Sequence, residues 1–348
     1  MMQLIQCGVG GYGSTWLDTV AEFRGRVSTA ALVDVDDVAL AAARSRTGIP
    51  ENRCFSSLRR ALDAVEADAV LCVVPPSHHE TVITQALDAG LHVLTEKPIA
   101  DTMEASRRIV DVARRSQGTL MVSQKGRFHP WVRRFREAVQ NQEVGPLSHL
   151  TLHFRAAEFR WGSGSDFRHR MADPLLLEMS IHHFDLVRAL LGRDPVEVTG
   201  SSWNTTWSGF AGDVAASLRF TMDDGTPVLY EAYIRSSGDL TSWYGDIRAE
   251  CAEGVVTMVF PHLFLARRGA TQWPRLQVSA PRKDLTLVSE PHDGQGLVFR
   301  EFLDAIDAGR VPESSGVANL VSVAMLFAAV DACHSRERRR IADYLQPS

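Results

Sequence analysis

The chain has 348 residues, of which 45% are hydrophobic and 23% are charged, a composition typical of a globular protein long enough for two domains. Its formal net charge of −5 argues against a nucleic-acid-binding surface, which normally shows a basic excess. The five cysteines form no C-x-x-C pair and fit reduced thiols better than a disulfide framework. With no basic leader and no run of 18 apolar residues, we expect a cytoplasmic protein that does not enter a membrane.

The first part of the chain alternates between short apolar runs and longer helical patterns. Strands are expected at residues 4–7, 29–33, 69–74, 91–94 and 119–122. Helices are expected between them, at residues 14–23, 38–46, 58–65, 79–89 and 103–116. The strand runs lack alternation, which indicates strands covered on both faces. This βαβ repetition predicts a doubly wound parallel sheet, a Rossmann domain spanning residues 1–123.

After residue 123 the pattern changes. Helices are expected at residues 131–140 and 174–191, the second capped by Asp173 and stopped by Gly192. A strand-like run is expected between them at residues 147–159. Strands then follow one another at residues 196–203, 213–220, 227–234, 243–249 and 255–260, and helices return at residues 297–308 and 317–335. We predict a second, α+β domain spanning residues 124–348, terminal helices included, built on a mostly antiparallel, open-faced sheet.

A glycine-rich segment lies between the first expected strand and helix. Residues 8–13 read Gly-Val-Gly-Gly-Tyr-Gly. In a dinucleotide fingerprint the first glycine permits a tight turn, the second lets the backbone approach a pyrophosphate, and the third allows close helix–strand packing. The following helix N-terminus favours phosphate groups. We expect cofactor contacts from Gly8, Gly10, Gly11, Tyr12 and Gly13.

Asp34 ends the second expected strand, where an acidic side chain normally accepts the adenosine ribose hydroxyls. Asp36 and Asp37 follow, and no arginine occurs between Asp34 and Arg44. Three carboxylates would repel a 2′-phosphate, so the pattern favours NAD over NADP. An alternative is that Asp34 caps the strand end while Asp36 binds the ribose.

Two further segments make a family identifiable. Residues 73–79 read Val-Val-Pro-Pro-Ser-His-His and residues 91–98 read Leu-His-Val-Leu-Thr-Glu-Lys-Pro. Together with the glycines, they resemble the Gfo/Idh/MocA oxidoreductases, the glucose–fructose oxidoreductase and inositol dehydrogenase superfamily. The resemblance matches residues 96–98 to the family's E-K-P motif and adds cofactor contacts from Val74 (threonine in the family), Pro75, His79, Glu96 and Lys97.

The same resemblance implies that Lys97 is catalytic, that it lies beside the nicotinamide, and that the Lys97–Pro98 bond is cis. An ammonium in that place can stabilise a developing alkoxide. The alternative is a surface lysine paired with Glu96.

Residues 176–185, Leu-Leu-Glu-Met-Ser-Ile-His-His-Phe-Asp, resemble the family's L-L-D-x-G-I-H-x-I-D helix. The match makes His182 the catalytic histidine and Glu178 the neighbouring catalytic carboxylate. In an α-helix, Glu178, His182 and Asp185 would share one face, and a carboxylate one turn away would orient the imidazole for general-base work. Ser180 replaces a common glycine, which could narrow the pocket, and a structural histidine is the alternative for His182.

Aromatic and polar residues concentrate in the loops of the second domain, which suits a hydroxylated ring. Residues 126–130 also resemble the family's R-F/Y-x-P segment. Candidate substrate contacts are Lys125, Arg127, Trp161, Arg170 and His183, although His183 could instead pack between the domains. No Cys/His spacing supports a metal site.

The sequence thus predicts an NAD-dependent oxidoreductase that transfers a hydride between the nicotinamide and a secondary alcohol of a sugar, cyclitol or related polyol. One alternative is an enzyme that uses tightly bound NAD transiently for glycoside cleavage or epimerisation. Another is a non-catalytic NAD-binding sensor. The open sheet and the resemblance predict a homodimer or homotetramer.

Overall fold

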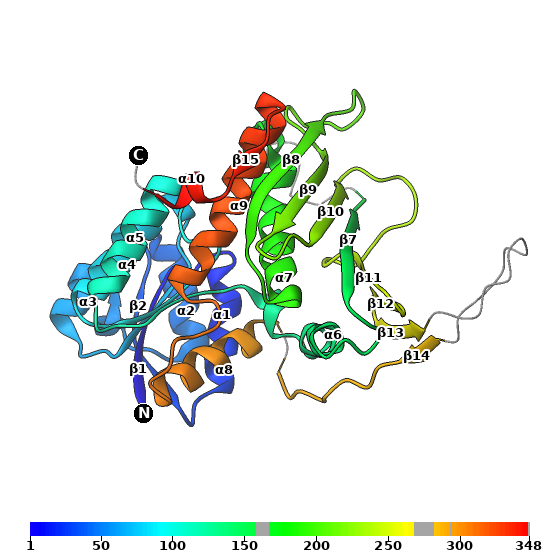
Figure 1. The fold of residues 1–348 in the computed structure, drawn as a ribbon. Helices are drawn as coiled ribbons and strands as arrows, with labels where there is room; N and C mark the ends of the chain where they lie inside the picture. Colours follow the sequence, from blue (N-terminus) through cyan, green and yellow to red (C-terminus); the bar gives the residue numbers. More distant parts are fainter. Residues whose placement is uncertain (158–166, 268–281, 293, 347–348) are drawn as a thin grey trace, which may run out of the picture. The chain divides into compact units, whose positions relative to one another are not determined.

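The computed structural model describes residues 1–157, 167–267, 282–292 and 294–346. The described chain divides into two compact units, each with its own sheet (Figure 1). Unit 1 combines Met1–Lys125 with Pro291–Val323, and unit 2 combines Gly126–Glu290 with Ala324–Gln346.

Unit 1 is built on a six-stranded parallel sheet of order β3-β2-β1-β4-β5-β6. Its strands are β1 (Met2–Cys7), β2 (Val27–Val33), β3 (Cys54–Phe55), β4 (Ala69–Cys72), β5 (His92–Thr95) and β6 (Leu120–Val122). The helices between them are α1 (Gly13–Glu22), α2 (Asp37–Thr47), α3 (Leu58–Ala64), α4 (His79–Asp88) and α5 (Met103–Arg115). Every residue of β4 is buried, as expected of a strand covered on both faces. The predicted doubly wound sheet is confirmed, and its strand order reverses between β1 and β4, where such sheets bind ligands.

The helix α8 (Gly294–Asp307) and the first part of α9 (Gly316–Ser335) also belong to unit 1. Phe299 of α8 packs edge-on against Trp16 and Phe23 of α1, with ring centroids 6.3 and 5.2 Å apart. Arg26 pairs with Asp304 of α8 at 2.7 Å. The prediction that both terminal helices lie in the second domain was therefore wrong for residues 291–323.

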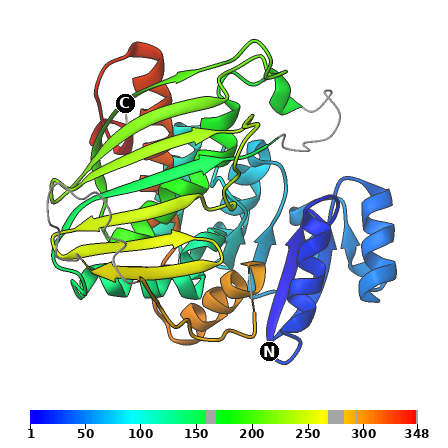
Figure 2. The same ribbon diagram turned by 90° about the vertical axis from the view of Figure 1, so that its right-hand side faces the viewer.

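Unit 2 is built on a nine-stranded sheet of order β14-β13-β12-β11-β7-β10-β9-β8-β15, seen face-on in Figure 2. Its strands are β7 (Leu147–Arg155), β8 (Pro195–Trp203), β9 (Ala215–Met222), β10 (Pro227–Tyr233), β11 (Asp246–Cys251), β12 (Gly254–Val259), β13 (His262–Arg267), β14 (Arg282–Asp284) and β15 (Arg339–Arg340). All neighbours are antiparallel except β7 and β10, which run parallel. The mostly antiparallel sheet is confirmed.

One face of this sheet is packed and the other is open. The packed face carries alternate buried residues such as Leu150, Leu152 and Phe154 of β7. The helices α6 (Pro130–Gln140), α7 (Ile181–Leu191) and α10 (Ala342–Leu345) belong to unit 2, as does the last part of α9. Among the described residues, no helix covers the face of the sheet turned to the viewer in Figure 2.

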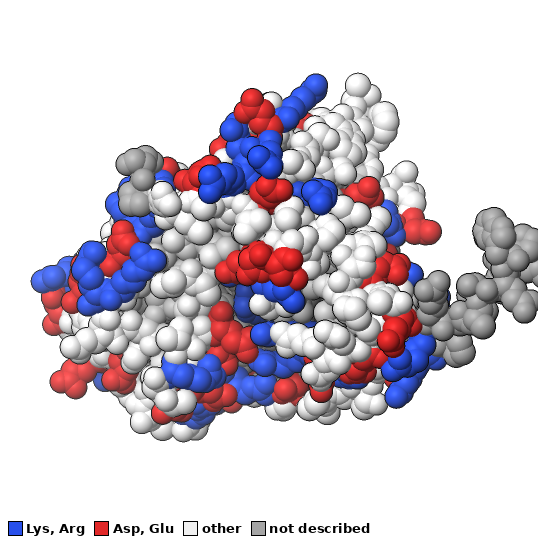
Figure 3. All heavy atoms as spheres, in the orientation of Figure 1, with Lys and Arg blue, Asp and Glu red and all other residues white. Residues whose placement is uncertain are grey.

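The open face of the central strands carries mostly polar side chains, with Leu229 of β10 also exposed. His153 of β7 lies 3.4 Å from Glu231 of β10, and Arg155 lies 3.1 Å from Asp246 of β11. Acidic and basic side chains are also interspersed over the view of the molecule in Figure 3.

The helix α9 is the one described helix with the length and mean hydropathy of a membrane span. Two thirds of its apolar window, 67%, is buried inside the protein, as is usual for a core helix.

Candidate functional site

The glycine-rich loop joins β1 to α1 with no space for a side chain at two of its glycines. Gly8 has φ +86°, and a Cβ there would lie 2.4 Å from the carbonyl oxygen of Val73. A Cβ on Gly13 would lie 2.3 Å from the carbonyl oxygen of Gly8. Gly11 and Tyr12, at the tip of the loop, are exposed. The loop thus forms a close-packed turn with an exposed backbone at a helix N-terminus, which is the geometry that a pyrophosphate requires.

The carboxylate of Asp34 holds this loop in place. Its Oδ2 accepts hydrogen bonds from the amides of Val9 and Gly10, at 2.8 and 3.2 Å, and its Oδ1 accepts from the amide of Asp36 at 3.0 Å. A carboxylate accepts about four hydrogen bonds, so one position remains for a ribose hydroxyl. Asp34 therefore anchors the loop, and its predicted contact with the ribose stays a prediction.

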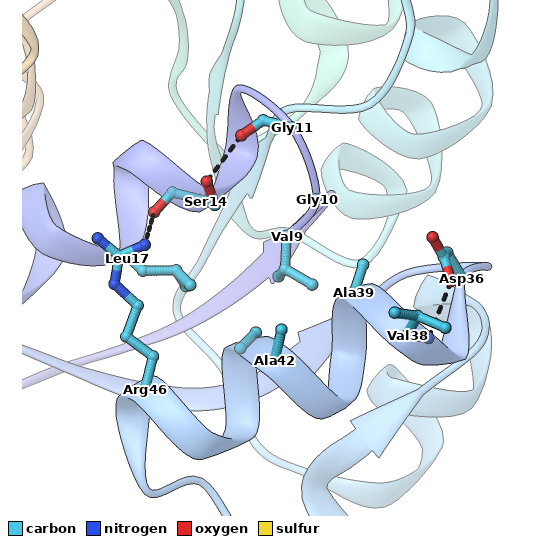
Figure 4. A pocket seen from close by; sticks show the side chains of 11 residues that line it. Val9, Gly10, Gly11, Ser14, Leu17, Asp36, Val38, Ala39, Ala42 and Arg46 are labelled. Carbon is cyan, nitrogen blue, oxygen red and sulfur yellow. Dashed lines mark hydrogen bonds between the residues drawn. The ribbon is translucent and has the colours of Figure 1, made fainter.

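A cavity of about 310 Å³ adjoins the loop (Figure 4). Gly10 and Gly11 form one wall, and a face of α2 forms another. Asp36 lines the cavity and caps α2 by accepting a hydrogen bond from the Val38 amide at 2.8 Å. Arg46 also lines it, but donates to the Ser14 carbonyl at 2.9 Å and pairs with Asp18. The charged side chains that line the cavity are thus the carboxylate of Asp36 and the guanidinium of Arg46, which is already paired.

Lys97 follows β5 at the carboxyl end of the parallel strands. The Lys97–Pro98 bond is cis, which confirms the expectation. Glu96 is buried, and its Oε1 accepts a hydrogen bond from the indole nitrogen of Trp16 at 3.0 Å. Its Oε2 accepts from the backbone amide of Lys97 at 3.2 Å. Glu96 therefore ties the backbone of Lys97 to α1 and is itself withdrawn from the surface.

His79 is completely buried between two loops, although we had expected it to contact the cofactor. Its Nε2 lies 2.9 Å from the carbonyl oxygen of Val74, and its Nδ1 lies 3.0 Å from that of Pro98. Burial lowers the pKa of this imidazole despite the neighbouring carbonyls. His79 thus acts by holding the turn at Val74 against the segment after Lys97, and Pro75, in that turn, is exposed.

Lys125 lies in unit 1, although we had assigned it to the second domain as a substrate contact. Its amine hydrogen-bonds the hydroxyl of Tyr12 and lies 4.9 Å from the centre of the Tyr12 ring. Its described contacts are therefore with the glycine-rich loop.

In unit 2, His182 lies in the first turn of α7 and is half-buried. Its ring packs edge-on against that of Trp243, with centroids 5.5 Å apart and planes inclined by 66°. Trp243 precedes β11 and is 44% exposed, so an aromatic surface is open to solvent beside the imidazole.

The turn before α7, η5 (Leu175–Ser180), is π-helical rather than α-helical. The Ser180 hydroxyl lies 3.2 Å from the carbonyl oxygen of Leu175, five residues earlier. The α-helical spacing that placed Glu178 beneath His182 does not apply across such a turn. The described partner of the Glu178 carboxylate is Arg168, whose Nε donates at 3.1 Å.

Two other predictions for this helix were wrong. Asp173 does not cap it; its carboxylate pairs with His334 at 2.9 Å. Ser180 does not narrow a pocket, because it is completely buried and its hydroxyl lies 2.8 Å from that of Tyr230.

Arg127 forms a buried ion pair instead of the expected substrate contact. Its Nε and Nη2 donate to the two carboxylate oxygens of Asp185 at 2.8 and 2.9 Å. Both side chains are nearly inaccessible, with 9% and 2% exposure. The pair fixes the segment that opens unit 2 to α7, and Asp185 is thereby withdrawn from the His182 face.

His183 is also completely buried and cannot reach a substrate. Its Nδ1 lies 2.9 Å from the Tyr230 hydroxyl and its Nε2 lies 3.0 Å from the carbonyl oxygen of Trp243. Burial lowers its pKa to about 4, so the ring is neutral at neutral pH. Arg170 is exposed, and Trp161 lies outside the described residues.

Several residues that hold the candidate site in place were not predicted from the sequence. The partners of Glu96 and Glu178, Trp16 and Arg168, lie 80 and 10 residues away from them and belong to no motif. The exposed Trp243 was noted only as one of several loop aromatics.

These features define the class of protein to which the chain belongs. A parallel sheet of this order, with a glycine cradle at its first βα turn and an anchored carboxylate after β2, is an NAD-binding Rossmann domain. It is joined to an α+β domain with a histidine at a helix start, as in two-domain dinucleotide-dependent oxidoreductases.

Comparisons with known proteins agree and give the family. Residues 3–124 match the oxidoreductase family with an NAD-binding Rossmann fold, and residues 132–262 match the GFO/IDH/MocA C-terminal domain. The chain belongs to the Gfo/Idh/MocA oxidoreductase family, and it is an NAD-binding oxidoreductase.

Among relatives, the uncharacterized protein y4oX of Sinorhizobium fredii is 28% identical over 99% of this chain and 97% of its own length. Inositol 2-dehydrogenase of Corynebacterium glutamicum is 31% identical over 57% of each chain.

Solved structures share the fold at lower identity. An oxidoreductase from Agrobacterium radiobacter, in complex with NAD⁺, L-tartaric acid and magnesium, has a TM-score of 0.85 at 17% identity, covering 98% of this chain and 99% of that one. UDP-N-acetylglucosamine 3-dehydrogenase from Acidithiobacillus ferrooxidans has a TM-score of 0.77 at 22% identity, covering 99% of each.

Proposed function

We propose that the protein is an NAD-dependent dehydrogenase that oxidises, reversibly, a secondary alcohol of a sugar, cyclitol or related polyol. The observation that carries the proposal is Lys97, which the buried Glu96 fixes at the carboxyl end of β5 in a sheet built to bind NAD. The names of relatives, inositol 2-dehydrogenase and UDP-N-acetylglucosamine 3-dehydrogenase, support a substrate that carries ring hydroxyls.

In this mechanism NAD, when bound, supplies the acceptor for the hydride. His182 takes the proton of the substrate hydroxyl, since imidazole is the side chain that changes charge near neutral pH. Lys97 stabilises negative charge that develops on the substrate. Glu178 stays the proposed catalytic carboxylate of this segment, and Arg168 holds it through a hydrogen bond of 3.1 Å.

We also propose NAD rather than NADP as the cofactor. Asp34 and Asp36 place two carboxylates beside the glycine-rich loop, and Arg46 is engaged with Asp18 and Ser14. A 2′-phosphate would meet repulsion without a cation ready to pair with it.

The same proposal includes a cytoplasmic enzyme that assembles as a homodimer or homotetramer. The reduced cysteines and the open sheet of unit 2 support it. Sedimentation of the purified protein measures the subunit count, and a monomer at working concentration contradicts this part of the proposal.

The test follows NADH formation from NAD with a panel of myo-inositol, D-glucose and UDP-N-acetylglucosamine. Lys97→Ala and His182→Ala should each abolish turnover while calorimetry shows that NAD still binds. The exposed Lys283 and His262 supply matched controls, since alanine there should leave the rate unchanged. Unchanged turnover in either site variant overturns the mechanism. Conversion of a substrate without any release of NADH would instead indicate transient oxidation, as in epimerisation.

A further inference from the structure

A buried chain of hydrogen bonds in unit 2 ends at the loop beside His182. Ser180 and His183 of the η5–α7 segment both contact the Tyr230 hydroxyl, at 2.8 and 2.9 Å, and His183 in turn bonds the carbonyl oxygen of Trp243 at 3.0 Å. Ser180, Tyr230 and His183 each have 0% exposure. Neither NAD chemistry nor hydride transfer explains this chain, because its three side chains are sealed from any ligand.

The partners fix the direction of every proton in the chain. The carbonyl oxygen of Trp243 can only accept, so Nε2 of His183 carries a hydrogen. The neutral ring then accepts at Nδ1, and the Tyr230 hydroxyl donates to it. The Tyr230 oxygen in turn accepts the single hydroxyl hydrogen of Ser180, so the Leu175 carbonyl, 3.2 Å from that hydroxyl, does not receive it. The chain is therefore satisfied at each buried atom, and such fully paired networks hold one geometry.

The loop at the end of this chain is also fixed from its other side. The hydroxyl of Tyr244 lies 2.5 Å from Nε2 of His129, just before α6. Gly245 has φ +80°, and a Cβ there would lie 2.8 Å from the carbonyl oxygen of His153. His183, His129 and the close-packed Gly245 thus hold the backbone of the loop that carries Trp243.

We propose that Trp243 is the surface on which the ring of a polyol substrate rests, and that Ser180, Tyr230 and His183 are positioning residues that set Trp243 against His182. The inference deepens the proposed function and rests on it. A large aromatic ring that is 44% exposed, on a loop fixed from two sides and edge-on to a histidine, suits the apolar face of a sugar or cyclitol.

These hydrogen bonds affect the position of Trp243 and do not act on the reacting atoms. Without the Tyr230 hydroxyl, Nδ1 of His183 is a buried acceptor with no donor, a cost that the ring relieves only by moving. Any such movement shifts the carbonyl group of Trp243 and the aromatic ring with it. The expected defect is therefore in substrate binding, with the chemical step less affected.

The experiment compares steady-state kinetics for whichever of myo-inositol, D-glucose and UDP-N-acetylglucosamine the wild type oxidises fastest. Trp243→Ala should raise KM for that compound about tenfold, whereas Trp243→Phe, which keeps an aromatic face, should stay within about threefold. Tyr230→Phe should raise KM about fivefold with kcat within about twofold, since it loses one buried hydrogen bond. Tyr233→Phe, in the same strand, is the matched control and should leave KM unchanged.

Hydrogen exchange of the NAD-bound protein supplies a readout independent of turnover. Tyr230→Phe should speed exchange in the peptide that contains residues 241–245 and leave the peptide of β12 unchanged. Faster exchange throughout unit 2 would show a general loss of stability and overturn the positioning role. An unchanged KM in Trp243→Ala would overturn the substrate surface. If His182→Ala abolishes turnover in the same series, the proposed function survives either result.

Discussion

The indole nitrogen of Trp16 donates a 3.0 Å hydrogen bond to Oε1 of Glu96, across 80 residues of sequence. The bond connects the helix that opens at the glycine-rich loop to the residue before Lys97. Because Oε2 of Glu96 also accepts from the Lys97 amide, one buried carboxylate joins the cofactor loop to the candidate catalytic lysine.

Trp16→Phe should lower the free energy of unfolding by about 1–3 kcal/mol, because Oε1 of the buried Glu96 carboxylate loses the hydrogen bond from the indole. It should also lower kcat more than it weakens NAD binding, since it loosens the backbone of Lys97. Trp131→Phe is the matched control: its indole nitrogen is buried without a hydrogen-bond partner among the described residues. Urea unfolding and NAD titration check both variants, and equal effects of the two substitutions would contradict the role of the bond.

Arg127→Met should destabilise unit 2 by about 3–5 kcal/mol, because the buried carboxylate of Asp185 loses both hydrogen bonds from the guanidinium, although Arg188 still lies 4.0 Å away. Arg127→Met combined with Asp185→Leu should recover much of that loss, since the buried carboxylate is then gone together with its partner. Urea unfolding of the two single variants and the double variant gives the coupling energy. A raised KM in Arg127→Met at unchanged stability would restore the substrate contact that we first expected.

The free energy of unfolding should fall in mild acid because the folded protein keeps His183 neutral. Burial holds its pKa at about 4 in the folded state, whereas an unfolded histidine titrates near 6.5. Between these values the unfolded chain binds the extra proton, so this stability is fully present above about pH 6.5 and is lost as the pH falls toward about 4. The loss from pH 7 to pH 5 should be about 2 kcal/mol.

Urea unfolding at both pH values measures this loss, and His183→Gln should remove it. His79, whose pKa burial also lowers, adds a contribution of the same sign that stays in the variant. His262→Gln, at an exposed position, should keep the wild-type pH dependence. The assignment fails if His183→Gln keeps it as well.

Asp36→Ser should improve NADP use relative to NAD by about fivefold, equivalent to about 1 kcal/mol for one nearby charge in water. Serine retains the cap of α2, so helix stability should change little. Asp34→Ser should instead weaken both cofactors, because it releases the amides of Val9 and Gly10. The ratio of kcat/KM for the two cofactors is the measurement, and an unchanged ratio in Asp36→Ser would show that its carboxylate does not face the ribose.

The sequence predicted the parallel half of the fold well, because its strands are buried on both faces and read as uninterrupted apolar runs. It predicted β7 to β12 from alternation and turns, although β11 begins at Asp246 rather than 243. Alternation could not predict edge strands such as β15, a two-residue strand of arginines that pairs with β8.

The residues of the candidate site were also only partly predictable from the sequence. Motifs identified Lys97 and His182 because their neighbours in sequence carry the resemblance. They did not separate surface residues from buried ones: Arg127, His79 and His183 all look like ligands in the sequence and are held by buried partners. The partners of Arg127 and His183 lie 58 and 47 residues away in the sequence, and no spacing rule predicts the π turn at 175–180.

The membership of α8 in unit 1 has a consequence for synthesis. Trp16 and Phe23 are covered by Phe299, which leaves the ribosome nearly three hundred residues after the glycine-rich loop. During synthesis the aromatic surface of Trp16 and Phe23 therefore stays uncovered by Phe299 until strands β7 to β14 have been translated.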